Sequence, residues 1–345
     1  MSKFDFDTDH LADYLEQHID GFSGPLNSSK FAGGQSNPTF RLDTANKSYV
    51  LRRKPPGKLL RGAHAVDREF RVLSALQNTD VPVARTYHLC EDESIIGSMF
   101  YVMEFVSGRV LWDPTLPDME PAQRTAIYRE MNRVLAALHS VNVEDVGLQS
   151  FGKPGDYFAR QINTWTKQYQ ASEISRIESM VQLIEWLPDN LPAEDGQATI
   201  VHGDYRLDNL MFDAHEESII AVLDWELSTI GHPYADLAYQ CMQYYMPRGA
   251  GLPGLAGLDY ARLGIPSESE YIAMYCQRAG IEEIPNWNFY LSFSLFRLAA
   301  ICQGVKKRSV DGNASSEKAN SYGAIVEPLA NIALELAREN ASSSA

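Results

Sequence analysis

The segment His202-Gly203-Asp204-Tyr205-Arg206-Leu207-Asp208-Asn209 places a carboxylate and an amide five positions apart. Another carboxylate, Asp224, follows the apolar run Ser218–Leu223 and begins Asp224-Trp225-Glu226. Phosphoryl transfer needs a carboxylate that orients the attacking hydroxyl and accepts its proton, together with oxygen ligands for magnesium. The pattern therefore predicts Asp204 as the base, with Asn209 and Asp224 as ligands of a hard cation such as Mg²⁺.

A single aspartate after a glycine is most often a turn residue, so none of these side chains carries the prediction alone. The prediction depends on the joint pattern of an HGD loop, an asparagine five residues after Asp204, and Asp224 at the end of an apolar strand.

A second pattern, Phe31-Ala32-Gly33-Gly34-Gln35-Ser36-Asn37, lies between two expected strands. Small residues let backbone N–H groups come close to phosphate oxygens, so Gly33 to Asn37 are candidates for nucleotide binding. The alternative is a plain hairpin turn, because such turns also favour Gly and Asn. The sequence contains no GxxxxGK[ST], which excludes the phosphate loop of P-loop NTPases.

A cation for the α and β phosphates is expected at Arg52, in Tyr49-Val50-Leu51-Arg52. Its predicted partner is Glu69, on the helix that follows. The alternative is a surface arginine and a solvated glutamate, because most exposed ion pairs contribute little to stability.

The elements that must position these residues indicate an α+β chain. Residues 1–106 form the expected nucleotide-binding region, with an antiparallel sheet and one main helix, and residues 107–345 form a mainly helical catalytic and substrate region. The apolar spacing predicts helices at 8–18, 65–77 and from Pro121, strands at 30–31, 39–43, 47–52, 85–91 and 99–106, and a hairpin of 209–212 with 218–223.

Composition limits the classes of function. The net charge of -15 argues against general binding of nucleic acid, and the four cysteines lack the spacing of a zinc site. The acidic start MSKFDFDTDH does not fit a secretory signal, which predicts a cytoplasmic protein. No run reaches the roughly 20 apolar residues that cross a bilayer, so no membrane partner is expected.

Taken together, these residues resemble the aminoglycoside phosphotransferase and choline kinase superfamily, over roughly residues 31 to 236. The resemblance implies a two-lobed protein-kinase-like fold, ATP and Mg²⁺ as cofactors, and a small-molecule hydroxyl as acceptor. Met103-Glu104-Phe105-Val106 looks like the hinge, where the backbone of Glu104 and Val106 would bind adenine. Gly231 to Ala238 looks like the segment that supports the catalytic loop, with Asp236 in a structural role.

Within the superfamily, the runs Leu51–Gly57, Leu59–His64 and Asp67–Phe70 resemble the kinase domains attached to some acyl-CoA dehydrogenases. This subgroup implies a hydroxyacyl-CoA acceptor and a functional link to an acyl-CoA dehydrogenase. Cationic side chains in these runs could then meet the phosphates of the acceptor as well as those of ATP, or could form a solvated face: Arg52, Arg53, Lys54, Lys58 and Arg61.

The sequence departs from the kinase pattern in two places. Many kinases have lysine where Arg52 stands, so Arg53 is an alternative phosphate ligand. Asp224 is followed by Trp225-Glu226 rather than Phe-Gly, and no long segment separates Glu226 from Pro233. The short connection favours a small molecule over a peptide as the acceptor.

The acceptor pocket has weaker candidates. Tyr157, Arg160, Trp165 and Tyr169 recur at near-helical spacing and could line a cleft, but helical aromatic stripes more often pack in a core. Two other functions stay open. One is a catalytically silent nucleotide-binding module that regulates a partner, and the other is phosphorylation of aminoglycosides, which an acidic surface would attract.

Overall fold

The computed structural model describes residues 6–31, 37–55, 64–249, 253–311 and 322–343. They form two compact units. The first unit contains Met1–Arg109, Glu144–Phe151 and Leu210–Ser228, and the second contains Val110–Val143, Gly152–Asn209 and Thr229–Ala345. The domain division at residues 106 and 107 stays a prediction. In the compact units, two later segments of the chain pack with the N-terminal one.

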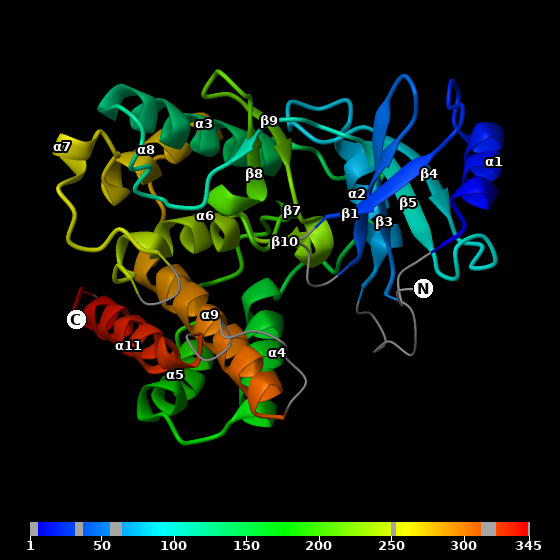
Figure 1. Cartoon of the computed structure of the whole chain (residues 1–345). Helices are drawn as coiled ribbons and strands as arrows, with labels where there is room; N and C mark the ends of the chain where they lie inside the picture. The colour runs from blue at the N-terminus through cyan, green and yellow to red at the C-terminus, as the bar shows by residue number, and fades with distance from the viewer. Residues whose placement is uncertain (1–5, 32–36, 56–63, 250–252, 312–321, 344–345) are drawn as a thin grey trace. The chain divides into compact units, whose positions relative to one another are not determined.

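The first unit is built on a five-stranded antiparallel sheet, shown in blue and cyan in Figure 1. Its strands are paired in the order β1-β2-β3-β5-β4. Along its central strands, buried residues either alternate with less buried ones or follow one another, as expected for strands that cover a core. The register pairs Leu51 with Val102 and Arg52 with Tyr101. The strands are β1 (Asn27–Lys30), β2 (Thr39–Asp43), β3 (Ser48–Arg53), β4 (Thr86–Cys90) and β5 (Phe100–Glu104).

Helix α1 (Thr8–His18) packs on this sheet through one apolar face. Its N-cap is Asp7, whose carboxylate accepts hydrogen bonds from the backbone N–H groups of Asp9 and His10. Leu11 and Leu15 are fully buried in the same core as Leu42, Phe100 and Val102 of the sheet. The apolar residues that recur at helical spacing in this segment therefore form the buried face of α1.

Helix α2 (Val66–Leu76) and the hairpin of β8 (Leu210–Phe212) and β9 (Ile219–Val222) complete the first unit. The Arg68 guanidinium donates to the main-chain oxygens of Phe151 and Ser228, and Val222 N–H donates to the carbonyl of Pro82. These bonds fix the chain that follows β9. That chain contains the turn η2 (Trp225–Leu227), and β8 and β9 share a small sheet with β6 (Arg109–Val110).

The second unit is mainly helical and packs around α9 (Trp287–Val310), which contacts α4, α5, α6 and α11 (Figure 1). Phe293, Leu295 and Phe296 of this helix are buried. A two-stranded sheet joins β7 (Thr199–Val201) to β10 (Thr229–Gly231). The other elements are α3 (Pro121–Ser140), α4 (Tyr157–Ser172), α5 (Glu178–Asp189), η1 (Leu207–Asn209), α6 (Tyr234–Cys241), η3 (Met242–Tyr244), α7 (Tyr260–Leu263), α8 (Glu268–Ala279) and α11 (Val326–Ser343).

The predicted α+β class, with an antiparallel N-terminal sheet and a mainly helical remainder, is confirmed. Helix α3 begins at Pro121 as expected, and the hairpin after Asn209 is present. The first strand is earlier than predicted, at Asn27–Lys30, although Phe31 N–H still donates to the carbonyl of Thr39. Within the described residues, no helix combines the length and apolar character needed to span a membrane.

Gly108 offers a test of how tightly the hairpin is packed. A Cβ added at Gly108 would lie 2.2 Å from the carbonyl oxygen of Phe212, a backbone atom that cannot move aside alone. We therefore expect Gly108→Ala to lower the free energy of unfolding by about 1–3 kcal/mol, measured by thermal and denaturant unfolding. Gly304→Ala is the matched control, because its Cβ would meet nothing closer than 3.8 Å on α9. Equal stability of Gly108→Ala and wild type would contradict the packing.

Candidate active site

In the first unit, Arg52 faces three carboxylates. Its Nε lies 2.7 Å from Glu69 Oε2, and an Nη lies 2.9 Å from Asp224 Oδ1 and 3.7 Å from Glu226 Oε2. Only 13% of the Arg52 side chain and 2% of the Glu69 side chain are exposed. One buried cation therefore faces three acids, which leaves an excess of negative charge beside the sheet.

Glu69 is held by neutral donors as well as by Arg52. Asn37 Nδ2 donates to Oε1 at 2.7 Å, and the Tyr101 hydroxyl donates to Oε2 at 3.1 Å. Burial raises the pKa of Glu69 to about 7, the charge of Arg52 opposes that rise, and the nearby charges of Asp224 and Glu226 add to it. Each added positive charge at this cluster would favour the ionised form of Glu69.

Asp224 follows β9 in a left-handed backbone conformation, with φ of 60°. This region costs energy for a residue with a side chain, and such positions cluster at functional sites. The next residue fixes the turn, because the Trp225 indole donates to the carbonyl of Val222 at 2.9 Å. The backbone thus holds the Asp224 carboxylate against Arg52.

Arg53 and Lys54 occupy other positions than Arg52. Consecutive strand residues point to opposite faces, and Arg53 Nε donates to Ser98 Oγ in a buried contact at 2.8 Å. Lys54 Nζ lies 3.6 Å from Asp67 Oδ1.

At the expected hinge, Glu104 ends β5 and its N–H donates to the carbonyl of Arg85 at 2.7 Å, with Val106 two residues further on. Gly33, Gly34, Gln35, Ser36, Lys58 and Arg61 lie outside the described residues.

In the second unit, the loop after β7 holds Asp204 and Asn209 together. Asn209 Nδ2 donates to the main-chain oxygen of Asp204 at 2.8 Å and to its carboxylate Oδ2 at 2.9 Å. The amide nitrogen is therefore used to fix Asp204, and Asn209 Oδ1 is the atom left to meet a cation. Gly203 has φ of 85°, a conformation that glycine adopts without strain.

Arg206 is a neighbour of Asp204 that the sequence analysis did not single out. Its Nε lies 3.3 Å from Asp204 Oδ1, and its Nη lies 3.0 Å from Asp208 Oδ2. Burial lowers the pKa of Arg206, but the charges of Asp204 and Asp208 raise it further than burial lowers it, so the guanidinium stays charged. The sequence signal that could have identified Arg206 is its position between Asp204 and Asn209 in the HxDxxxxN pattern.

Asp236, at the first turn of α6, anchors the same loop. Its fully buried carboxylate accepts hydrogen bonds from His202 N–H at 2.6 Å and Gly203 N–H at 2.8 Å. His139 Nε2 lies 3.5 Å away. Burial raises the pKa of Asp236, but His139, the charge of His202 and the Gly203 amide lower it more, so the net shift is downward. Asp236 thus supports the loop, as the family resemblance implied.

The residues nominated for an acceptor pocket pack elsewhere in the second unit. Tyr157 and Tyr169 are buried in the core. Arg160 donates to the main-chain oxygens of Gly155 and Lys153, and Trp165 donates to Gln161 on the same helix. The preferred core interpretation fits both tyrosines.

A model of the phosphotransferase enzyme family (APH) matches residues 28–281, which is most of the chain. The chain belongs to this phosphotransferase family. It is similar to a crystal structure from Ralstonia eutropha JMP134, described as that of a candidate aminoglycoside phosphotransferase. The two are 54% identical, with a TM-score of 0.91, over 97% of this chain and 99% of that one.

Curated relatives of this phosphotransferase bear the name of another enzyme. It is 50% identical to mouse (Mus musculus) acyl-CoA dehydrogenase family member 10, over 94% of this chain and 31% of that protein. It is 46% identical to human (Homo sapiens) family member 11, over 98% of this chain and 44% of that protein. The phosphotransferase therefore spans less than half the length of these relatives.

The predicted kinase-like fold is confirmed by a wider set of structures. APH(4)-Ia in its apo form superimposes with a TM-score of 0.63 at 15% identity, covering 97% of this chain and 99% of that one. The expected superfamily and its subgroup of dehydrogenase-associated domains are confirmed by the family match and by the curated relatives.

Asp236 gives a test with a defined pH dependence. Asp236→Asn leaves a buried loop amide without its charged acceptor, so we expect a loss of about 1–3 kcal/mol in unfolding free energy at neutral pH. A pKa lowered by folding means that the stabilisation is present above the unfolded value of 3.8 and is lost as the pH falls through the lower folded pKa. The difference between the variant and wild type should therefore narrow in acid.

Thermal unfolding across a pH series measures this difference, with Asp189→Asn at an exposed position of α5 as the control. A difference that stays constant from neutral pH to strong acid would show that the Asp236 charge does not hold the loop.

Proposed function

We propose that this phosphotransferase moves the γ-phosphoryl group of ATP to a hydroxyl of a small molecule, in a reaction that depends on Mg²⁺. The observation that carries the proposal is the double hydrogen bond of Asn209 Nδ2 to Asp204. It fixes the carboxylate of the proposed base through the amide nitrogen, so that the amide oxygen of the same side chain would be the metal ligand.

In this proposal Asp204 orients the acceptor hydroxyl and takes its proton as the new bond to phosphorus forms. Arg206 Nε, 3.3 Å from Asp204 Oδ1, helps to hold the carboxylate in place in the resting protein. The family match supports phosphoryl transfer as the class of reaction. A catalytically silent module would have no need of a base held in this way.

The proposed metal ligands are Asn209 Oδ1 and the Asp224 carboxylate. The described residues contain no group of three or more His, Cys, Asp or Glu side chains that could hold a metal by themselves. Magnesium on a nucleotide fits that finding, because it commonly takes one or two protein oxygens and completes its shell with phosphates and water. The negative excess around Arg52 also suits a divalent cation.

For the nucleotide, we propose that Arg52 meets the α and β phosphates and that Glu69 holds its guanidinium in place. The backbone at Glu104 and Val106 is the proposed adenine site, and Gly33 to Asn37 are the proposed phosphate-covering loop. APH(4)-Ia is described in a ternary complex with ADP and hygromycin B. At 14% identity that likeness carries the fold alone, so the ATP proposal depends on the residues of this chain.

The proposed acceptor is a hydroxyacyl-CoA, with a functional link to an acyl-CoA dehydrogenase. The names of the curated relatives support this choice, because the matched segment lies within proteins called acyl-CoA dehydrogenases. An aminoglycoside is the competing acceptor, in accord with the description of the Ralstonia eutropha structure.

Replacing the base tests the reaction. We expect Asp204→Asn to reduce kcat by about 100-fold or more, since a positioned general base contributes about that factor, while ATP affinity is largely retained. The measurement is Mg²⁺-dependent release of ADP from ATP across hydroxyacyl-CoAs, aminoglycosides and small amino-alcohols. Asp189→Asn is the control, and wild-type turnover in Asp204→Asn would remove Asp204 from the mechanism.

Replacing Asp224 tests the metal. Asp224→Asn keeps a side chain that tolerates the left-handed backbone but removes its charge. We expect ATP to bind about tenfold more weakly in the presence of Mg²⁺ and with little change in its absence, as measured by calorimetry. Asp213→Asn, in the turn of the same hairpin, is the control. An unchanged Mg²⁺ dependence in Asp224→Asn would count against this ligand.

A further inference from the structure

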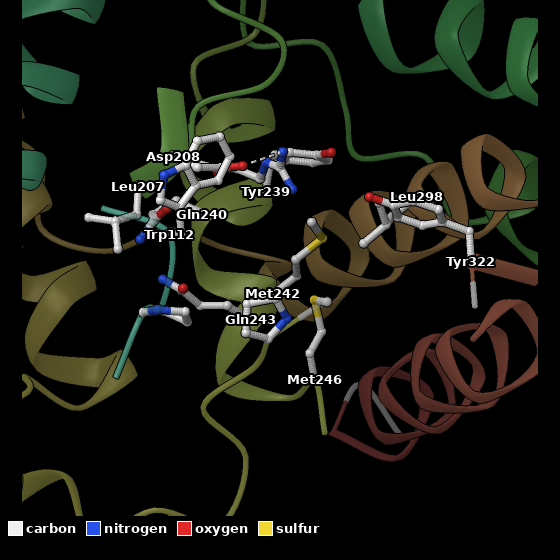
Figure 2. A pocket seen from close by; sticks show the side chains of 13 residues that line it. Trp112, Leu207, Asp208, Tyr239, Gln240, Met242, Gln243, Met246, Leu298 and Tyr322 are labelled. Carbon is white, nitrogen blue, oxygen red and sulfur yellow. Dashed lines mark hydrogen bonds and ion pairs between the residues drawn. The ribbon is translucent and has the colours of Figure 1, made fainter. Parts of the chain in front are cut away.

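A cavity of about 460 Å³ opens in the second unit. It lies beside the loop of residues 202–209, which contains Asp204 and is called the catalytic loop below. This volume is in the range of small-molecule sites. Figure 2 shows Trp112, Leu207 and Asp208 on one side, Leu298 and Tyr322 on the other, and Met242, Gln243 and Met246 between them. None of the residues nominated from the sequence lines this cavity.

The lining of the cavity has no excess of charge. Its charged side chains are Arg206 and Asp208, which lie 3.0 Å apart and pair with each other. The other lining side chains are apolar, aromatic or amide groups. A polycationic ligand would therefore find no surplus carboxylate here, whereas an uncharged apolar chain would be removed from water.

Two amide groups in this lining have hydrogen-bonding capacity that none of the described residues uses. Gln240 Nε2 and Gln243 Nε2 are buried, and neither has a hydrogen-bond partner among the residues that the structure describes. Only 2% of Gln240 is exposed. A buried unpaired donor costs about 1–3 kcal/mol, and an acceptor atom of a ligand would remove that cost.

The two glutamines lie on the same face of the helical segment α6–η3 as Asp236, which holds the loop that carries Asp204. Asp236, Tyr239, Gln240 and Gln243 stand at spacings of three, four and seven residues, which place them on the same side of a helix. Asp236 holds the catalytic loop, and burial together with the nearby charge of Asp204 raises the pKa of Tyr239. A ligand bound by the glutamines would thus lie along the helix from the base.

We propose that this cavity binds the acyl part of a hydroxylated acyl thioester, with Gln240 and Gln243 donating to its carbonyl oxygen. The inference rests on the proposed kinase function and names the chemistry that its acceptor must have. Met242, Met246 and Leu298 pack against the acyl chain. Trp112, which is 73% exposed, offers an apolar surface to the part of the acceptor outside the cavity.

In the transfer itself, the acceptor hydroxyl oxygen forms a bond to the γ-phosphorus of ATP, and its proton passes to Asp204. The bond between the γ-phosphorus and the β,γ-bridging oxygen breaks, with its electron pair leaving on ADP. The glutamines form no bond to the phosphoryl group, so they determine which acceptor binds and leave the ATP site unchanged.

The experiment compares a hydroxyacyl-CoA thioester with its thioether analogue, in which a methylene replaces the carbonyl. We expect wild type to show a KM for the thioester about tenfold below that for the thioether. Gln240→Leu and Gln243→Leu should each raise the thioester KM about tenfold, with the KM values for the thioether and for ATP unchanged. Gln182→Leu, a half-buried glutamine on α5 that does not line the cavity, is the matched control.

Stability distinguishes a ligand-binding role from a structural one. Since the two amide nitrogens have no partner among the described residues, the leucine variants should unfold at the wild-type Tm or above it. Weaker thioester binding in a protein of undiminished stability would support the proposal. Variants that keep the wild-type ratio of thioester to thioether KM would overturn it.

Direct binding of the thioester without ATP separates this inference from the kinase proposal. Thioester binding that the leucine variants lose, with no turnover of any acceptor, would support the cavity assignment and refute the kinase. Mg²⁺-dependent turnover of aminoglycosides alone, with no thioester binding, would support the kinase and overturn the cavity assignment.

Discussion

The loop of residues 202–209 depends on one buried charge, that of the Asp236 carboxylate. The carboxylate of Asp236 is fully removed from water, and the amides of His202 and Gly203 together with His139 replace the lost hydration. Tyr205 adds a second anchor by donating to the carbonyl of Met131 on α3 at 2.8 Å. The backbone that carries Asp204 and Asn209 is therefore held in place on both sides of Asp204.

The charged side chains around Arg52, in contrast, do not balance one another. A cluster of three carboxylates and one guanidinium does not neutralise itself. Burial raises the pKa of Glu69, and the charges of Asp224 and Glu226 add to that rise while Arg52 opposes it. A buried ion pair alone seldom maximises stability, because desolvation offsets much of the attraction. The surplus negative charge is the feature of this cluster that suits the divalent cation of the proposed function.

The sequence predicted the elements well where periodicity was strong. Leu11 and Leu15 of α1, the start of α3 at Pro121 and the hairpin after Asn209 all followed from spacing and turn chemistry. The ion pair between Arg52 and Glu69 is present because both residues lie on regular elements whose register is fixed by apolar neighbours. Motif residues on such elements can be located from the spacing of their apolar neighbours alone.

The cavity could not be predicted in this way. Every residue of α6 is buried, so the helix has no polar face from which its contacts could be read. A glutamine at such a position looks like a satisfied core residue, and only the three-dimensional structure shows Gln240 without a partner among the described residues. Arg206 escaped notice for a related reason, because its contact with Asp204 depends on the local fold of the loop.

The shared helix face also has a consequence for how such proteins can diverge. Side chains at 240 and 243 can be exchanged one at a time while Asp236 keeps its hold on the loop, so the proposed acceptor preference is free to vary by substitution. Insertion of one residue between Asp236 and Gln240 would instead rotate everything beyond it by about 100° around the helix axis. Natural relatives with different acceptors should therefore differ here in residue identity and agree in segment length.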